Sequence, residues 1–278
     1  AVNVYLVFRI VYINLNDIKT ASITALFFSV NVSSAEALLY VSGISDILST
    51  SFVLLSFYFC CTYDRKPKTN YFILVGIFYT LALFTKETTI LMLPLLVLTD
   101  VLVWRFKKKI RYPFYGLLAA VTLVYLIIGS FYWKTSAALN DGIYTLGWHV
   151  FKNIFVMQLS LFVPNPYMFS IKNYAIGFTP FWGQLIFFAI GLVILVMESI
   201  VWHRGTNRMK IFITWVIIFL LPASLFLNPS RRTLYLAASG LSMLLILMAA
   251  ALPLKAKKTT IALLLGLSGC NSLFIQLR

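Results

Sequence analysis

The hydrophobic positions of this chain gather in long runs, separated by short breaks that contain charged residues, proline or glycine. The run over residues 91–98 does not alternate between apolar and polar positions, as the strands of a membrane barrel would. Most runs approach or exceed the roughly 17 to 25 residues that a helix needs to cross a bilayer. The pattern predicts an all-α, polytopic membrane helix bundle of about ten spans. The predicted spans are residues 2–15, 20–32, 47–63, 71–85, 88–104, 112–133, 181–202, 211–228, 234–254 and 259–275.

Composition excludes a soluble domain. The 278 residues are 61% hydrophobic and 11% charged, whereas soluble domains carry about a quarter charged residues. We find no internal repeat and no polar segment long enough for an appended domain, so residues 1–278 are predicted to form a single transmembrane domain. Because the sequence opens with Ala1 inside an apolar run and stops just after the last predicted span, we expect it to be a fragment of a longer protein.

The net charge of +15 comes from short basic loops and not from one basic face, so we predict no nucleic-acid partner. Every second connection is basic. The positive-inside rule therefore predicts a multi-pass protein of the plasma membrane or endoplasmic reticulum, with these loops in the cytoplasm and both chain ends on the opposite side. The basic loops contain Arg65, Lys66 and Lys68; Arg105, Lys107, Lys108, Lys109 and Arg111; Arg204, Arg208 and Lys210; and Lys255, Lys257 and Lys258.

This alternation requires that residues 150–180 make no net crossing. The apolar run over residues 154–163 is short and ends in Pro164-Asn165-Pro166. We therefore predict a re-entrant or interfacial segment there.

The eight acidic residues divide between the two faces of the predicted bundle. Four are expected to be solvated residues at the cytoplasmic face: Asp17, Asp64, Asp100 and Glu198. The other four fall on the outer face: Glu36, Asp46, Glu87 and Asp141. Residues 31–46 are too polar to span and too apolar to leave the membrane, so a helix on the membrane surface is predicted.

Glu36 and Asp46 are the candidate catalytic acids, because a carboxylate kept near an apolar wall is costly without a functional reason. The alternative for Glu36 is a cap or a surface position. The alternative for Asp46 is the N-terminal cap of the following span.

Three cations on the outer face are candidates for binding a phosphate. Lys86 joins two spans directly with Glu87, which also suits the dipoles of the two helices. Arg231 and Arg232 lie on the face where the positive-inside rule disfavours positive charge, and arginine binds phosphate with two parallel hydrogen bonds. Ordinary head-group contact is the alternative. The cysteines and histidines show no metal-ligand spacing, so no cofactor is predicted and a divalent metal has no support in the sequence.

Three stretches resemble motifs of the GT-C fold membrane glycosyltransferases, and they are closest to the protein O-mannosyltransferase-like branch whose members often carry tetratricopeptide repeats. Residues 25–31, Glu36-Ala37 and residues 42–46 resemble its surface-helix motif. Residues 83–88, with Lys86-Glu87, are similar to its short Lys-Glu turn. Residues 232–236, Arg-Thr-Leu-Tyr-Leu, with Gly240 resemble its late Arg-x-Leu-Tyr-Leu motif.

The chain also departs from that branch. The branch usually has His-Pro at Asn31-Val32, an arginine at Ile44 and a glutamate at Arg231. Its catalytic aspartate belongs to the outer loop between the first and second spans. This chain resembles the branch from the second span onward, so the N-terminal first span and the catalytic loop would lie upstream of Ala1.

The resemblance implies an enzyme that transfers a hexose, with inversion, from a polyprenyl-phosphate donor to a hydroxyl of a protein, glycan or lipid on the non-cytoplasmic side. Glu36 and Asp46 would be catalytic, Lys86, Arg231 and Arg232 would bind the donor phosphate, and Glu87 and Tyr235 would support them. Membrane lipids, the donor and the acceptor are the expected partners. A transporter or flippase for a lipid-linked substrate and a non-catalytic membrane scaffold are the alternatives. The charged residues lie near the ends of the predicted spans and the sequence has no internal repeat, and both observations disfavour a transporter. The non-catalytic scaffold remains an alternative because the catalytic loop of the branch would lie upstream of Ala1.

Overall fold

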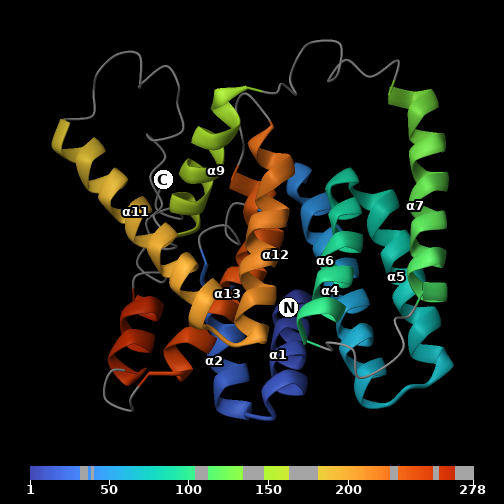
Figure 1. The fold of residues 1–278 in the computed structure, drawn as a ribbon, viewed down its shortest axis with the longest axis horizontal. Helices are drawn as coiled ribbons and strands as arrows, with labels where there is room; N and C mark the ends of the chain where they lie inside the picture. The colour runs from blue at the N-terminus through green and yellow to red at the C-terminus, as the bar shows by residue number, and fades with distance from the viewer. Residues whose placement is uncertain are drawn as a thin grey trace.

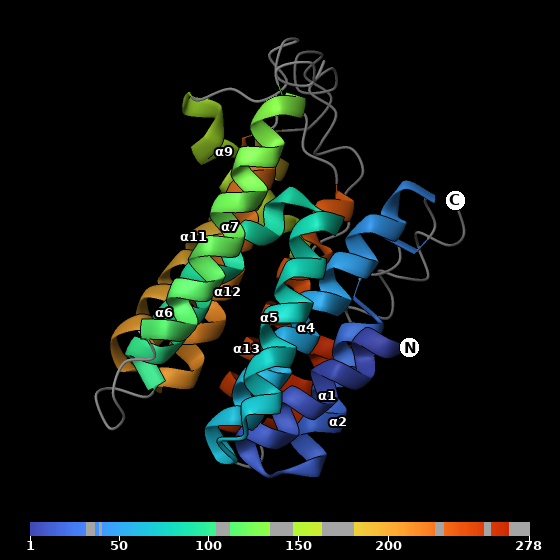
Figure 2. The same ribbon diagram turned by 90° about the vertical axis from the view of Figure 1, so that its right-hand side faces the viewer.

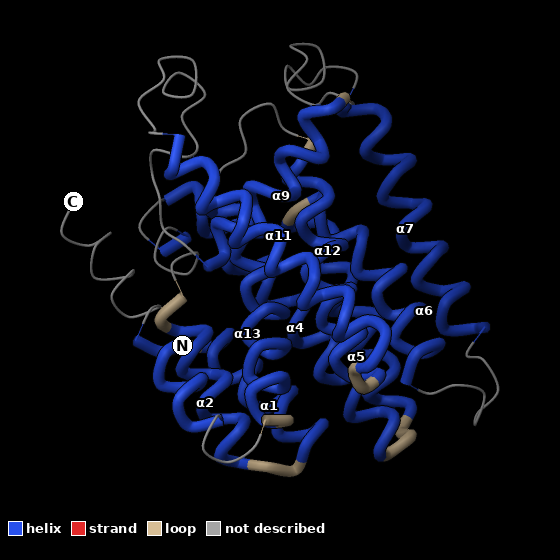
Figure 3. The backbone as a smooth tube through the Cα atoms, turned by 60° about the vertical axis from the view of Figure 1, so that its left-hand side comes forward, coloured by secondary structure: helices blue, strands red, loops and turns tan. Residues whose placement is uncertain are grey.

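The computed structural model of this chain describes residues 1–31, 37–38, 41–103, 112–133, 147–162, 181–225, 231–252 and 257–266. These residues form helices and their connections, and no strand occurs among them (Figures 1 and 3). The predicted all-α class is therefore confirmed.

The helices follow the predicted apolar runs closely. The α-helices are α1 (Val2–Leu15), α2 (Ile18–Ser29), α4 (Ile44–Arg65), α5 (Thr69–Thr85), α6 (Met92–Val103), α7 (Tyr112–Trp133), α9 (Trp148–Phe162), α11 (Phe181–Arg204), α12 (Asn207–Ser224) and α13 (Tyr235–Ala250). Three short 3₁₀ helices join them: η1 (Val41–Gly43), η2 (Glu87–Leu91) and η4 (Arg231–Leu234). A further helix covers residues 257–266.

Helices from the N-terminal half of the chain pack against one another, and α12 and α13 from the C-terminal half pack against them. α4 packs against α5 and α1, and the three run alongside one another (Figure 2). α12 contacts α13, α6 and α9, while α13 also packs on α2 and α4. Segments far apart in sequence are thus brought together where α4, α12 and α13 meet.

Trp215 of α12 is the largest fully buried side chain at this meeting point. Its indole N–H donates to the carbonyl of Leu236 at 3.0 Å, and its ring meets Phe57 edge-on at 5.1 Å. A Cβ atom at Gly240 would overlap the indole. The glycine that follows the late motif therefore lets α12 and α13 approach closely.

The bundle has two distinct ends. The connections between α1 and α2, between α4 and α5, and between α11 and α12 lie at the lower end in Figure 1. These connections and the helix turns next to them contain seven described cations: Lys19, Arg65, Lys66, Lys68, Arg204, Arg208 and Lys210. We call this the basic end.

Three helices are long and apolar enough to cross a membrane, judged by length and composition within the described residues. They are Ile44–Arg65, the segment Phe114–Phe131 of α7, and Asn207–Ser224. Four shorter apolar helices are α1, α2, α5 and α13. The 14 residues of α1 rise only about 21 Å, against a hydrocarbon thickness of about 30 Å. The prediction of about ten spans is thus not confirmed and stays a prediction.

α9 lies in the region predicted to make no net crossing. It packs against α12 and α11, and the amide of Asn153 donates to the carbonyl of Ser224 at 3.0 Å. Residues 163–180 lie outside the described residues, so the predicted re-entrant or interfacial path remains a prediction. Residues 32–36 and 39–40 of the predicted surface helix at 31–46 also lie outside them.

The four acids predicted to be solvated, Asp17, Asp64, Asp100 and Glu198, are instead half-buried, which corrects that prediction. Both carboxylate oxygens of Glu198 lie 3.1 Å from the amide nitrogen of buried Gln158. Asp100 accepts a hydrogen bond from the hydroxyl of Tyr115. A carboxylate inside a bundle needs such partners because desolvation without them is costly.

Candidate functional site

Asp46 lies in the first turn of α4, and its side chain is the buried acid of the site. α4 begins at Ile44 with Gly43 as its N-terminal cap and no side-chain capping bond, so Asp46 is not the cap. The residue is 5% exposed. Its Oδ1 forms an ion pair with the ammonium of Lys86. The negative charge also suits the positive end of the α4 dipole.

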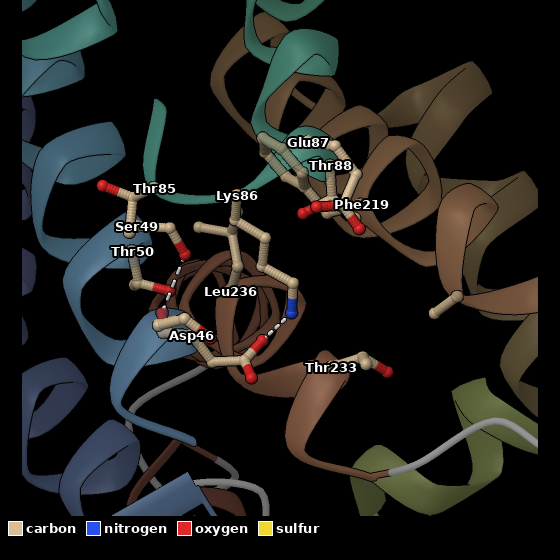
Figure 4. Close-up of a pocket in the computed structure, with 12 residues that line it drawn as sticks. Asp46, Ser49, Thr50, Thr85, Lys86, Glu87, Thr88, Phe219, Thr233 and Leu236 are labelled. Atoms are coloured by element: carbon tan, nitrogen blue, oxygen red, sulfur yellow. Dashed lines mark hydrogen bonds and ion pairs between the residues drawn. The ribbon is translucent and has the colours of Figure 1, made fainter. Parts of the chain in front are cut away.

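Lys86 is held at the predicted turn between two helical segments. α5 ends at Thr85, the Lys86 backbone is extended, and η2 begins at Glu87. The Lys86 N–H donates to the Ala82 carbonyl at 3.0 Å, and its own carbonyl accepts the Thr89 hydroxyl at 2.7 Å. These bonds fix the turn, so the side chain leaves it in one direction, toward α4 (Figure 4).

The ion pair lines a cavity of about 240 Å³ where four parts of the chain meet. Figure 4 shows Asp46 and Lys86 pointing toward each other, with Ser49 and Thr50 beside them on α4. Hydroxyl residues from α4, the Lys86 turn and η4 dominate its polar wall. The lining residues are Ser45, Asp46, Ser49, Thr50, Thr85, Lys86, Glu87, Thr88, Phe219, Ala223, Thr233 and Leu236.

The hydroxyls of the cavity wall differ in their hydrogen bonds. The Ser49 hydroxyl donates to the Asp46 carbonyl at 3.1 Å, and the Thr85 hydroxyl donates to the Leu81 carbonyl at 2.7 Å. The Thr50 hydroxyl is buried, and no hydrogen-bond partner for it exists among the described residues. Thr50 lies one helical turn after Asp46, so both side chains share a face of α4.

The structure brings three of the seven predicted site residues to this cavity: Asp46, Lys86 and Glu87. Glu87 is exposed at the start of η2. Arg231 and Arg232 open η4, the same short helix whose Thr233 lines the cavity, but their side chains lie outside what the structure describes. Glu36 also lies outside the described residues, so its predicted catalytic role stays a prediction.

Tyr235, predicted as a supporting residue, lines a different cavity of about 930 Å³ between α1, α2, α4 and α13. Its hydroxyl accepts from the Asn3 amide at 3.3 Å, and the same amide nitrogen donates to the Ile47 carbonyl at 3.1 Å. Since Ile47 follows Asp46 and Tyr235 precedes Leu236, the two cavities lie on either side of the α4–α13 contact.

The sequence analysis missed Ser49, Thr50 and Thr233. A serine or threonine within an apolar run is ordinary in a membrane helix, where its hydroxyl bonds to the preceding turn. The spacing of Thr50 four residues after Asp46 was the available signal. Within the described residues no three His, Cys, Asp or Glu side chains are grouped so that they could hold a metal ion.

Comparison with known proteins gives one result. A family model described as dolichyl-phosphate-mannose-protein mannosyltransferase matches residues 1–133. The matched stretch contains Asp46 and Lys86, whereas Arg231 and Arg232 lie beyond it. No curated protein and no solved structure matches the chain.

The match supports a membrane glycosyltransferase of the mannosyltransferase type. At that level it agrees with the resemblance found in the sequence. The branch that carries tetratricopeptide repeats stays a prediction.

Proposed function

We propose that this chain transfers a sugar from a polyprenyl-phosphate donor to an acceptor hydroxyl on the non-cytoplasmic side, with the Asp46–Lys86 cavity as its reaction site. The observation that carries the proposal is the buried ion pair in a hydroxyl-lined cavity, built from two of the three motifs and bordered by the third. The match to the mannosyltransferase family over the same helices supports the choice of chemistry.

Lys86 would bind the donor phosphate. An ammonium has three N–H donors, so it can hold Asp46 and a phosphate oxygen together. In this proposal Arg232, and beside it Arg231, reaches the same phosphate from η4. Cations at the leaving group stabilise the negative charge that develops there as the sugar departs.

Asp46 and Glu36 are the two candidates for the general base. In the proposed reaction the acceptor oxygen attacks the anomeric carbon, and the bond from that carbon to the phosphate oxygen breaks. The phosphate keeps the electron pair, and the acceptor proton passes to a carboxylate. Asp46 also positions Lys86, because their ion pair fixes where the ammonium lies.

The size and lining of the cavity fit one small polar group. Pockets for drug-sized ligands span about 300 to 1,000 Å³, so about 240 Å³ accommodates a single sugar ring or a phosphate but not a whole glycolipid. Hydroxyls around the ion pair can exchange hydrogen bonds with sugar hydroxyls.

The test is equilibrium binding of a polyprenyl-phosphate sugar to the purified full chain. We expect Lys86→Ala and Arg232→Ala each to weaken binding by about ten- to a hundredfold, because a lost charge-assisted hydrogen bond is worth roughly 1.5 to 3 kcal/mol. Arg231→Ala should have the smaller effect, since Arg232 is the residue that matches the motif. Lys66→Ala, an exposed cation at the basic end, is the matched control.

Equal affinities for the wild type and all four variants would refute the proposal and leave the non-catalytic scaffold as the better account. Transport of the lipid-linked sugar across vesicles without transfer to any acceptor would favour the flippase.

A further inference from the structure

A third cavity, of about 640 Å³, opens at the basic end of the bundle. It is lined by the α1–α2 connection, the start of α12, the last turn of α13 and Lys257. α12 runs from this cavity, at Asn207, to the Asp46–Lys86 cavity, at Ala223. The 16 residues between them rise about 24 Å, so the two cavities lie at opposite ends of the bundle.

Two cations and two apolar side chains give this third cavity its chemical character. Arg208 is exposed and Lys257 is half-buried, while Leu15 and Leu247 contribute apolar wall. Neither cation forms an ion pair with a carboxylate in the part of the chain that the structure describes. The cavity therefore offers two cationic donors beside an apolar surface.

Asp17, the acid of this cavity, is already engaged by its own helix. It caps α2, accepting from the Lys19 N–H at 3.0 Å and from the Thr20 hydroxyl at 2.6 Å. These bonds hold the pKa of Asp17 below its ordinary value, and the charge of Lys257 contributes to the same shift. The carboxylate is thus held on its own helix, and it forms no ion pair with Arg208 or Lys257 among the described residues.

We infer that this cavity binds the phosphodiester head group of an anionic membrane phospholipid, with Arg208 and Lys257 contacting the phosphate. A basic pocket between membrane helices, at the end where positive charge gathers, is the setting in which anionic head groups bind. A fork-shaped guanidinium and a mobile ammonium suit a phosphate, and the apolar wall suits the adjoining acyl chain. This inference does not depend on the proposed sugar transfer.

The experiment compares spin-labelled phosphatidylglycerol with spin-labelled phosphatidylcholine on the full chain in phosphatidylcholine vesicles. The wild type should prefer phosphatidylglycerol, and Arg208→Gln with Lys257→Gln should reduce that preference by about tenfold or more. Lys66→Gln with Lys68→Gln removes the same charge from the same end outside the cavity and should leave the preference nearly unchanged.

An equal preference in all proteins, or an equal loss in the control pair, would overturn the inference. Arg208→Lys with Lys257→Arg keeps both charges and should retain the preference. The single variants Arg208→Gln and Lys257→Gln should each lose part of it, which tests the site even if the double glutamine variant fails to fold. Soluble glycerol phosphate should displace labelled phosphatidylglycerol only at far higher concentration than the lipid. Equal potency would overturn the lipid assignment in favour of a free anion.

Discussion

Asp46 and Lys86 each compensate the cost of burying the charge of the other. The side chains are 7% and 15% exposed, so removing one partner leaves a poorly hydrated charge. We expect Lys86→Met to lower the free energy of unfolding by about 3 to 5 kcal/mol, as for other buried pairs that lose one member. The double variant Asp46→Asn with Lys86→Met should recover most of that loss, because two neutral groups remain. Denaturant titration in mixed micelles measures both values.

The same double variant separates stability from function. It should fold nearly as well as the wild type and yet fail to bind a polyprenyl-phosphate sugar, since the ammonium is gone. Tight donor binding by this variant would contradict the role of Lys86.

The buried Thr50 hydroxyl has no hydrogen-bond partner among the residues that the structure describes, and such a group costs about 1 to 3 kcal/mol in a folded protein. We expect Thr50→Val to raise the free energy of unfolding by about 1 kcal/mol while weakening donor or acceptor binding, because the hydroxyl is free to bond a ligand. Thr99→Val is the control. Its hydroxyl already donates to the Leu95 carbonyl at 2.7 Å, so its loss should not stabilise the protein. A less stable Thr50→Val variant would contradict this explanation.

Sequence reasoning found the charged members of the site and missed its neutral ones. Asp46 and Lys86 stand out because charge is rare in apolar runs. The ion pair between them could not be predicted from the sequence, because it depends on the extended backbone at Lys86 and on η2, which direct the Lys86 side chain toward α4. Thr50 carries no such signal, because a hydroxyl is ordinary in a membrane helix until its partners are known.

At the scale of the helix, α2 depends on its cap at Asp17. The Thr20 hydroxyl and the Lys19 N–H lower the pKa of Asp17 below its ordinary value of 3.8. A depressed pKa in the folded state stabilises the protein above the unfolded pKa, and this contribution is lost as the pH falls through the folded pKa. The capping contribution should therefore be complete above about pH 4 and disappear at lower pH.

Asp17→Ala should lower the free energy of unfolding at neutral pH by about 1 kcal/mol, the usual value of a lost cap. Asp17→Asn keeps a capping oxygen, so its stability should resemble that of the wild type at neutral pH. Because asparagine does not titrate, this variant should not show the decrease in stability that the wild type shows below pH 3.8. Thermal unfolding in a non-ionic detergent at both pH values measures the difference. Identical melting of the alanine variant and the wild type would show that the cap contributes nothing.

Helix positions were largely predictable, whereas the short connecting helices were not. The runs at 2–15 and 112–133 coincide with α1 and α7, because a long apolar run bounded by polar breaks leaves few other structures. The span predicted at 88–104 divides instead into η2 and α6. The hydrophobicity of residues 87–91 does not distinguish a 3₁₀ helix from an α-helix, because a segment of five residues is too short for the two periods to differ.

For the whole molecule, the apolar runs of the sequence determine the number of helices but not the number of membrane crossings. α1 and α2 are 14 and 12 residues long, too short to cross about 30 Å of hydrocarbon alone, yet both are packed on longer helices. A short helix in a bundle can be shielded by its neighbours and need not match the bilayer. Counting apolar runs therefore counts helices more reliably than spans.

The orientation of the bundle is the last prediction. Cations gather at the basic end, and the positive-inside rule places such an end in the cytoplasm. Figure 1 shows the start of α9 at the end of the bundle opposite the α4–α5 connection. Single cysteines at Lys66, in that connection, and at Trp148, the 87% exposed first residue of α9, should react with a membrane-impermeant maleimide from opposite sides. Cys60, Cys61 and Cys270 would first be replaced by alanine. Lys66→Cys should be labelled only after the membrane is opened, and Trp148→Cys in intact cells or right-side-out vesicles. Labelling of both from one side would overturn the orientation and, with it, the placement of the Asp46–Lys86 cavity on the non-cytoplasmic face.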